Sequence, residues 1–287
     1  MKTIDGVFSY ENEDIAALFP KRKPDSHKGD FGVAAIVAGY GSLGAPVLSV
    51  GAALKAGAGY TKLYLPPELY PAPRERLLAA MQMPACMLVE LNGIGELLPA
   101  DAIAYGMGAG VSEWVYETVR TILADYRGKL VLDADALNAI SAYGKDVLKT
   151  KMCEVIVTPH PKEFSRLTGK SVEEILKDPI GAAKAFAEEY GVTVLLKNHR
   201  SVITNGERIV INTIGSPALA KGGSGDVLSG FLAGTLARGL APFAAAVASA
   251  YILGRAGELA AFEMGEYSPD ATDIIRYLPR AILSLTE

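Results

Sequence analysis

The chain has 287 residues, of which 50% are hydrophobic, and its 28 basic and 32 acidic side chains give a formal net charge of −4. A chain of this length can bury a full core without disulfides or structural metals, and its acidic balance argues against nucleic acid or acidic membrane surfaces as partners. The N-terminus lacks a basic and apolar leader, and Cys86 and Cys153 form neither a CxxC pair nor a group with histidine, so the sequence predicts a cytoplasmic protein.

Short apolar runs of strand length alternate along the chain with longer helical segments, and Gly, Pro, Asn or Asp marks each junction. Most runs are apolar at consecutive positions, as expected for parallel strands that helices cover on both faces. The predicted strands are residues 33–38, 60–65, 102–105, 130–132, 155–158, 192–196 and 201–204. We therefore expect one α/β domain over residues 1–287, a three-layer α/β/α unit with a mostly parallel central sheet.

The expected helices cover residues 45–56, 113–126 and 180–190, and the chain is almost entirely helical from Asp226 on. Ser171 and Glu174 have the spacing of a capping box, and Gly191 is placed to end a helix. Asn205-Gly206 joins two apolar runs, which predicts an antiparallel hairpin at the sheet edge.

Two apolar stretches, residues 31–54 and 239–254, have some features of a membrane span. The first is uncharged but contains five glycines and a proline after Phe31, and the second is too short. Both are interpreted as interior elements.

The first motif with chemical potential is a GxGxxG pattern from Gly39 to Gly44, between a predicted strand and a predicted helix. A dinucleotide site of the Rossmann kind also requires an acid at the end of the second strand. Glu68 lies there but beyond Pro66 and Pro67, so a tight turn for packing is the alternative.

The second motif precedes the C-terminal helices and contains Gly222, Gly223, Ser224 and Gly225, followed by Asp226. Clustered glycines before a helix free backbone N–H groups for an anion, and the helix dipole adds positive charge. The same N–H groups are expected to keep Asp226 ionised beside a phosphate, where it could accept a proton. The alternative is that Asp226 only caps the helix.

Two further motifs follow predicted strands. Asp133 and Asp135 could hold a magnesium–phosphate complex largely through water, or Asp135 and Asn138 could begin a helix. His160 lies among prolines at a strand end, with Glu163 opening the next helix, and is expected to contact substrate. The three histidines show no metal-ligand spacing, and neither a P-loop nor a GxSxG nucleophile elbow occurs.

An ordered set of motifs covers nearly the whole chain: HKGDFG at 27–32, Gly44-Ala45 with AGAG at 56–59, GMGAG at 106–110, VLDADALN at 131–138, TPHPKEF at 158–164, and 212–230 with KGGSGDVLSG. With these motifs the chain resembles the ribokinase-like ADP/ATP-dependent NAD(P)H-hydrate dehydratases. The resemblance implies a ribokinase-like fold, no redox cofactor, and convergence of all these motifs on one cleft.

The resemblance also implies roles for individual residues. Those matching positions that contact the hydrated dinucleotide are Ala45, Gly110, His160 and Asp226. Those matching positions that contact the adenine nucleotide are Lys197, Asn198, His199, Arg200, Ser201 and Gly225. One departure is visible, because relatives commonly have Lys-Gly and then small residues where this chain has Lys-Asn-His-Arg-Ser.

The implied activity is a lyase reaction, in which the hydroxyl of (S)-NADHX or (S)-NADPHX is phosphorylated by ADP or ATP with Mg²⁺ and phosphate is then eliminated. A separate NAD(P)H-hydrate epimerase is the implied functional partner. Similar proteins are often homotetramers, and the alanine-rich helices after Phe243 could form an interface or lie in the core. The alternatives are a ribokinase-like kinase for a vitamin-precursor alcohol and a nucleotide-binding module without catalysis.

Overall fold

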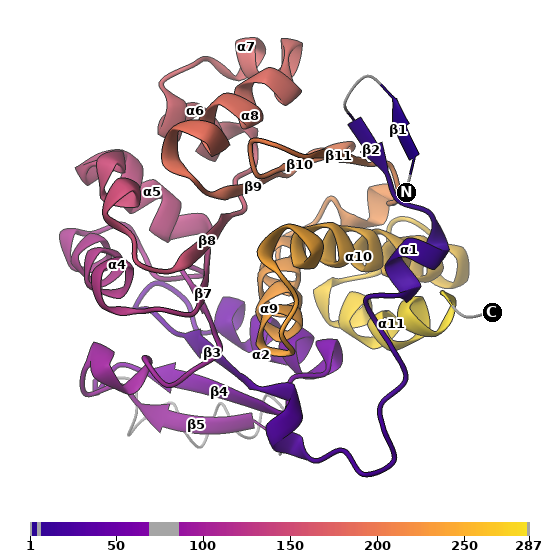
Figure 1. Cartoon of the computed structure of the whole chain (residues 1–287), viewed down its shortest axis with the longest axis horizontal. Helices are drawn as coiled ribbons and strands as arrows, with labels where there is room; N and C mark the ends of the chain where they lie inside the picture. Colours follow the sequence, from indigo (N-terminus) through magenta and orange to yellow (C-terminus); the bar gives the residue numbers. More distant parts are fainter. Residues whose placement is uncertain (1, 5–6, 69–85, 286–287) are drawn as a thin grey trace.

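A computed structural model describes residues 2–4, 7–68 and 86–285. Its strands form one sheet in the order β1-β2-β11-β10-β9-β8-β7-β6-β3-β4-β5, which runs through the molecule in Figure 1. The strands are β1 (Lys2–Ile4), β2 (Val7–Ser9), β3 (Val33–Val37), β4 (Tyr60–Leu65), β5 (Cys86–Glu90), β6 (Ala102–Tyr105), β7 (Lys129–Leu132), β8 (Glu154–Val157), β9 (Thr193–Leu196), β10 (Ser201–Thr204) and β11 (Ile209–Asn212). All pairings from β5 across to β9 are parallel, which confirms the predicted sheet type.

The predicted hairpin at Asn205-Gly206 is confirmed, because β10 pairs antiparallel with β11. Its predicted place at the sheet edge is wrong. The N-terminal strands β1 and β2 pair with each other, and β2 adds in parallel to the outer side of β11. Strands of three residues carry too little pattern to be recognised in the sequence, which is why this extension was missed.

Helices cover both faces of the sheet, as Figure 1 shows, and give the α/β/α layering that the apolar strands predicted. One layer contains α1 (Asn12–Ala16), α2 (Gly44–Ala56), α9 (Ser224–Ala237), α10 (Pro242–Met264) and α11 (Ala271–Leu283). The other contains α4 (Glu113–Asp125), α5 (Ala134–Tyr143), α6 (Pro161–Thr168), α7 (Val172–Lys177) and α8 (Pro179–Tyr190). Within β3, Ala34 and Ile36 face the first layer, whereas Ala35 and Val37 face the second.

Local helix signals behave as the sequence predicts. Ser171 and Glu174 form the capping box of α7, and Gly191 ends α8 in the left-handed conformation. The alanine-rich α10 buries Phe243 and most of its alanines in the core. Its small residues therefore serve internal packing.

Small residues also bring α2 and α9 into backbone contact. A Cβ atom on Gly230 would lie 1.9 Å from the carbonyl oxygen of Ser49, so only glycine fits there. The Ser49 hydroxyl donates a hydrogen bond of 2.8 Å to the carbonyl oxygen of Asp226. Helix α2 thereby fixes the first turn of α9.

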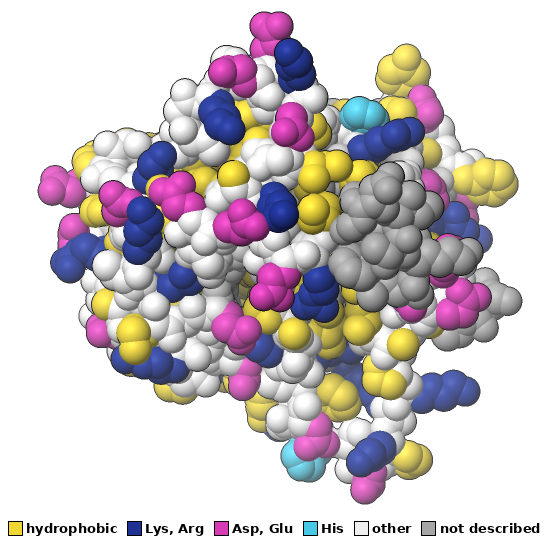
Figure 2. Space-filling model, turned by 45° about the horizontal axis from the view of Figure 1, so that its top comes forward, with side chains coloured by type: hydrophobic (Ala, Val, Ile, Leu, Met, Phe, Trp, Pro, Cys, Tyr) yellow, Lys and Arg dark blue, Asp and Glu magenta, His cyan; other side chains and the backbone are white. Residues whose placement is uncertain are grey.

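The surface carries both charge signs, as the near balance of 28 basic and 32 acidic residues leads us to expect. On the face shown in Figure 2, acidic and basic side chains are interspersed over most of the visible surface. In the part of the chain that the structure describes, no helix is both long and apolar enough to cross a bilayer.

Candidate active site

The carboxyl ends of the parallel strands carry most of the predicted motifs. Strand β7 leads into Asp133, β8 leads into His160, and β9 leads into Lys197. Because parallel strands all end at the same edge of a sheet, these side chains gather there. The first turn of α9, with Asp226, lies at the same edge.

A buried charge cluster forms the floor of this site. The ammonium group of Lys197 lies 2.7 Å from Oδ1 of Asp133 and 3.9 Å from Oε2 of Glu163. Oδ2 of Asp133 accepts a hydrogen bond of 2.7 Å from the Ser229 hydroxyl of α9. Asp133 is only 1% exposed, so both of its oxygens have partners in place of water.

The protonation of this cluster follows from burial and from its neighbours. Burial by itself lowers the pKa of Lys197, but the charges of Asp133 and Glu163 outweigh burial and raise it. Burial raises the pKa of Glu163, against the opposing effect of Lys197. Lys197 is therefore a permanent cation that belongs to the floor of the site, and sequence reasoning missed this pairing because its members lie far apart in the chain.

The carboxyl group of Asp226 holds its proton more tightly than the sequence predicts. Burial raises its pKa to about 6, the negative charges of Asp133 and Asp135 add to this, and Lys197 opposes it. No N–H group of the described residues donates to its carboxylate, so the prediction that such groups hold it ionised is wrong. Its side chain instead lies within electrostatic range of two other carboxylates, and the like charges favour its neutral form.

The glycine-rich turn before α9 has the properties of an anion site. Gly223 adopts a left-handed conformation with φ of 96°, and a Cβ atom there would lie 2.7 Å from that of Ala271. Among the described residues, no acceptor is found for the N–H groups of Gly222, Gly223, Gly225 and Asp226. Free N–H groups at the start of a 14-residue helix are suited to bind phosphate.

Gly225 connects this turn to the charge cluster. A Cβ atom at Gly225 would lie 3.4 Å from Nζ of Lys197 and 3.8 Å from Oδ2 of Asp133. The predicted anion turn and the buried lysine are therefore neighbours in space, although about 28 residues separate them in the chain. An anion on the turn would lie close to a fixed positive charge.

Two glycine loops meet at the other side of the site. The N–H group of Ser42 donates 2.9 Å to the carbonyl oxygen of Gly108, and a Cβ atom on Gly108 would lie 3.3 Å from that of Ala45. The N–H group of Gly110 donates 2.7 Å to Oδ2 of Asp135. A Cβ atom on Gly110 would meet nothing within 4 Å, so Gly110 borders open space, and Ala45 is partly buried beside the Gly108 loop.

The remaining carboxylates have separate partners. Asp133 and Asp135 bind different groups, and Asn138 accepts a hydrogen bond of 2.8 Å from Arg166. Glu68 accepts a hydrogen bond of 2.6 Å from the Tyr40 hydroxyl. Within residues 2–4, 7–68 and 86–285, no group of three or more His, Cys, Asp or Glu side chains is arranged to hold a metal ion.

His160 caps α6 as well as bordering the site. Its Nδ1 accepts hydrogen bonds from the N–H groups of Lys162 and Glu163, which leaves the proton of the neutral ring on Nε2. Burial and the charge of Lys197 lower its pKa. The side chain is 45% exposed at the rim of the site, and its Nε2 lies 3.4 Å from Oε1 of Glu163.

The turn between β9 and β10 lies at the surface next to Lys197. Ser201 donates a hydrogen bond of 3.0 Å to the carbonyl oxygen of Asn198, and the N–H group of His199 donates 2.8 Å to the Asn198 side chain. Asn198, His199 and Arg200 are exposed. The structure thus brings Lys197 into the site floor and leaves the next three residues at its edge.

The HKGDFG motif does not join this site. It forms the short helix η1 (Lys28–Phe31) before β3, and a Cβ atom on Gly32 would lie 2.1 Å from the carbonyl oxygen of Ala237. Ala237 ends α9, whereas Asp226 lies in its first turn. The expected convergence of all motifs on one cleft is therefore wrong, because residues before a parallel strand lie at the opposite edge from residues after it.

A family model described as NAD(P)H-hydrate dehydratase matches residues 34–280 of this chain. The chain is 36% identical over 275 residues to the ADP-dependent (S)-NAD(P)H-hydrate dehydratase of Cenarchaeum symbiosum, which covers 93% of this chain and 94% of that protein. It spans about half the length of other curated relatives, the bifunctional NAD(P)H-hydrate repair enzymes, including that of Thermofilum pendens.

Solved structures agree with the architecture. The crystal structure of the ADP/ATP-dependent NAD(P)H-hydrate dehydratase of Bacillus subtilis, co-crystallised with ATP and Mg²⁺, matches with a TM-score of 0.84 at 28% identity and covers 99% of this chain and 100% of that one. A ribokinase-like superfamily protein of Enterococcus faecalis matches with a TM-score of 0.83 at 26% identity, over 99% and 98% of the two chains. The predicted ribokinase-like fold is confirmed.

Proposed function

Because the chain belongs to the NAD(P)H-hydrate dehydratase family, we propose that it converts the (S)-epimer of NADHX or NADPHX back to NADH or NADPH with ADP or ATP as co-substrate. The observation that carries this proposal is that Asp226, the open N–H groups of the glycine turn and the Lys197–Asp133 pair meet at one end of α9. The open N–H groups are those of Gly222, Gly223, Gly225 and Asp226. A proton acceptor, an anion site and a fixed cation are the parts that phosphoryl transfer requires.

The chemistry has two steps. In the first, the Asp226 carboxylate accepts the proton of the ring hydroxyl as its oxygen attacks the terminal phosphoryl group, and AMP or ADP departs. In the second, the ring nitrogen lone pair assists cleavage of the carbon–oxygen bond, phosphate leaves, and loss of a proton from the adjacent ring carbon restores the double bond. Phosphorylation is needed because hydroxide is a poor leaving group.

The residues of this chain divide these tasks. An acceptor with a pKa of about 6 is ionised at neutral pH yet basic enough to take a proton in the transition state. The N–H groups of Gly222, Gly223, Gly225 and Asp226 would hold the transferring phosphoryl group. The N–H group of Ser224, expected from the sequence to join them, donates instead to the carbonyl oxygen of Lys221 at 3.4 Å. We assign hydrate contacts to Ala45, Gly110, His160 and Asp226. We assign adenine nucleotide contacts to Lys197, Asn198, His199, Arg200, Ser201 and Gly225.

Mg²⁺ is proposed to arrive with the nucleotide. Both oxygens of Asp133 are engaged by Lys197 and Ser229, and one oxygen of Asp135 is engaged by Gly110, so the chain does not offer an all-protein cage. A site without an all-protein cage suits Mg²⁺, which keeps several water ligands and binds phosphates. Asp135 would accept hydrogen bonds from water molecules bound to the ion. Bound there, the ion would neutralise charge on the transferring phosphoryl group.

We also propose a functional partner enzyme and an oligomeric state for this protein. A dehydratase for one epimer depends on an NAD(P)H-hydrate epimerase to use the other, so we propose functional pairing with such an enzyme. A homotetramer is the assembly proposed for the chain, and multi-angle light scattering measures it directly.

The test is an assay with purified protein, Mg²⁺, ADP or ATP, and NADHX. We expect absorbance at the reduced-nicotinamide wavelength to rise, with one phosphate released for each NADH formed. No rise with either nucleotide overturns the proposal. Accumulation of a stable phosphorylated product without NADH would instead identify a kinase.

A further inference from the structure

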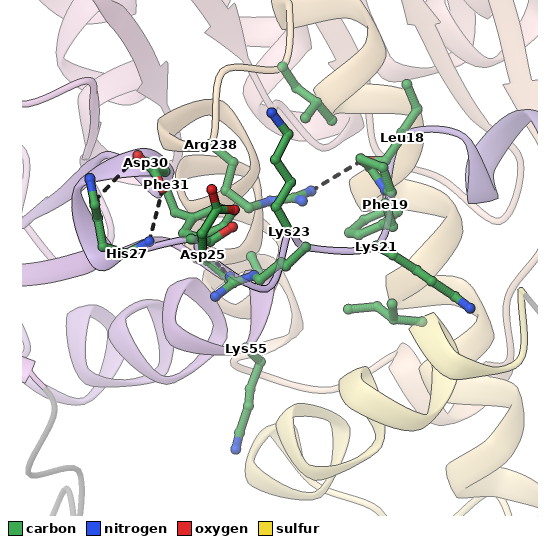
Figure 3. Close-up of a pocket in the computed structure, with 17 residues that line it drawn as sticks. Leu18, Phe19, Lys21, Lys23, Asp25, His27, Asp30, Phe31, Lys55 and Arg238 are labelled. Atoms are coloured by element: carbon green, nitrogen blue, oxygen red, sulfur yellow. Dashed lines mark hydrogen bonds and ion pairs between the residues drawn. The ribbon is translucent and has the colours of Figure 1, made fainter.

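A basic cavity lies at the amino ends of the parallel strands, opposite the end at which Asp226 lies. Its volume is about 720 Å³, and it lies between the segment from Leu18 to Phe31 and the C-terminal ends of α2 and α9 (Figure 3). The basic side chains that line it are Lys21, Arg22, Lys23, Lys55 and Arg238. None of the proposed active-site residues lines this cavity.

The positive charge of this cavity is not balanced by its own carboxylates. Asp25 and Asp30 are its acidic lining residues, and Asp30 already binds the N–H group and the ring of His27. Within the described part of the chain, neither Arg22 nor Arg238 forms an ion pair. An excess of basic groups therefore faces the cavity.

Two arginines meet at one glycine in its wall. A Cβ atom on Gly57 would lie 2.9 Å from Nη2 of Arg22 and 3.3 Å from Cδ of Arg238, so glycine allows both side chains to approach the same point. Each guanidinium lies over an aromatic ring, Arg22 at 3.7 Å from the Phe31 centroid and Arg238 at 4.7 Å from that of Phe19. The rings support both groups without neutralising them.

Arg238 in addition has an unused hydrogen-bond donor. Its Nε is buried and has no acceptor among the described residues, and its Nη2 contacts the carbonyl oxygen of Leu18 at 3.5 Å, which is a long hydrogen bond. Burial and the charge of Arg22 lower the pKa of Arg238, as expected for a cation without an anionic partner. The unpaired buried donor of Arg238 costs free energy unless an acceptor binds. Arg22 is exposed, and its Nη2 donates a hydrogen bond of 2.7 Å to the carbonyl oxygen of Gly57.

We propose that this cavity binds a phosphorylated small molecule, with Arg22 and Arg238 as the phosphate ligands and Lys23 and Lys55 at the rim. Arginine forks match the geometry of phosphate oxygens, and the volume suits a ligand of nucleotide size. Figure 3 shows Lys21 extending outward from the segment of Leu18 to Phe31 and Lys55 extending outward from α2, so both add positive charge around the cavity. The site is independent of the proposed dehydratase chemistry.

The test is lysine acylation of the full-length protein, read residue by residue by mass spectrometry, with and without inorganic pyrophosphate. At a pyrophosphate concentration about ten times the dissociation constant, mass action predicts about tenfold slower acylation of Lys23 and Lys55. Lys177 on α7 is the matched control, and its rate should not change. Sodium chloride at equal ionic strength should protect none of the three.

Two variants make the test specific. Arg22→Gln lies on an exposed segment and should fold normally while losing the protection, and Arg238→Lys should weaken it by removing the forked geometry. Equal protection by sodium chloride, undiminished protection in Arg22→Gln, or a change at Lys197 alone would overturn the proposal. Slower acylation at higher protein concentration without pyrophosphate would overturn it too, because a second copy of the chain would then cover the cavity.

Discussion

Lys197 and Asp133 form an ion pair of 2.7 Å at the carboxyl ends of β9 and β7, directly beneath the glycine turn that begins α9. Burial and the negative charge of Asp133 raise the pKa of the Asp226 carboxyl, whereas the fixed positive charge of Lys197 lowers it. The balance leaves Asp226 with a pKa near 6. The reactivity of the site therefore depends on this pair.

Replacing Asp226 with Asn should remove the proton acceptor while preserving shape. We expect kcat to fall by about 10²–10⁴-fold, the usual contribution of general base catalysis. Nucleotide affinity, measured by titration calorimetry, should change little. A variant that kept more than a tenth of the wild-type rate would show that another group accepts the proton.

The rate should depend on pH through Asp226. Only the ionised carboxylate accepts a proton, so kcat should be nearly constant above about pH 7 and fall about tenfold for each pH unit below about 6. Lys197→Met removes a charge that lowers this pKa, so the acidic limb should shift to higher pH. If the acidic limb of the pH–rate profile is identical in the wild type and the variant, Lys197 does not influence the pKa of the group that accepts the proton.

Stability provides a second readout of Asp226. Its pKa is raised in the folded state, so the folded protein holds this proton more tightly than the unfolded chain, and stability is lost as pH rises through about 6. The shift corresponds to at most about 3 kcal/mol, which partial exposure reduces to about 1–2 kcal/mol. Asp226→Asn should therefore have the larger free energy of unfolding at pH 7, with the difference absent at pH 4. Urea denaturation at both pH values measures it, and equal stabilities at pH 7 would contradict the raised pKa.

Gly225→Ala tests the contact between the anion turn and the charge cluster. The new methyl group would lie 3.4 Å from Nζ of Lys197, in the space that a phosphate would approach. We expect KM for the nucleotide to rise about tenfold, which corresponds to about 1.4 kcal/mol. Gly93→Ala is the control, because nothing lies within 4 Å of its added Cβ, its backbone is extended, and it lies outside the proposed site. Equal KM values in the two variants would place the nucleotide elsewhere.

Gly230→Ala tests whether α2 positions the first turn of α9. The methyl group would lie 1.9 Å from the carbonyl oxygen of Ser49 and must push the helices apart. We expect a loss of about 1–3 kcal/mol in the free energy of unfolding. kcat should also fall, because Ser49 bonds the carbonyl oxygen of Asp226. Gly95→Ala, in open space, should stay within about 0.5 kcal/mol of wild type.

Local patterns in the sequence determined most of the secondary structure and the type of sheet. Consecutive apolar residues predicted the parallel strands, Asn205-Gly206 predicted its hairpin, and Ser171 and Gly191 predicted a helix start and a helix end, because these signals act over a few residues. The glycines before Asp226 likewise indicated an anion site. Such features need no knowledge of distant contacts.

Only the tertiary structure decided which motifs share a site. HKGDFG precedes β3 and lies with Arg238 at one edge of the sheet, whereas the residues that follow the strands gather at the other. It also decided the pairing of Lys197 with Asp133 and the raised pKa of Asp226. Burial and charge are set by residues that are remote in the chain and close in space, so a linear pattern does not contain them.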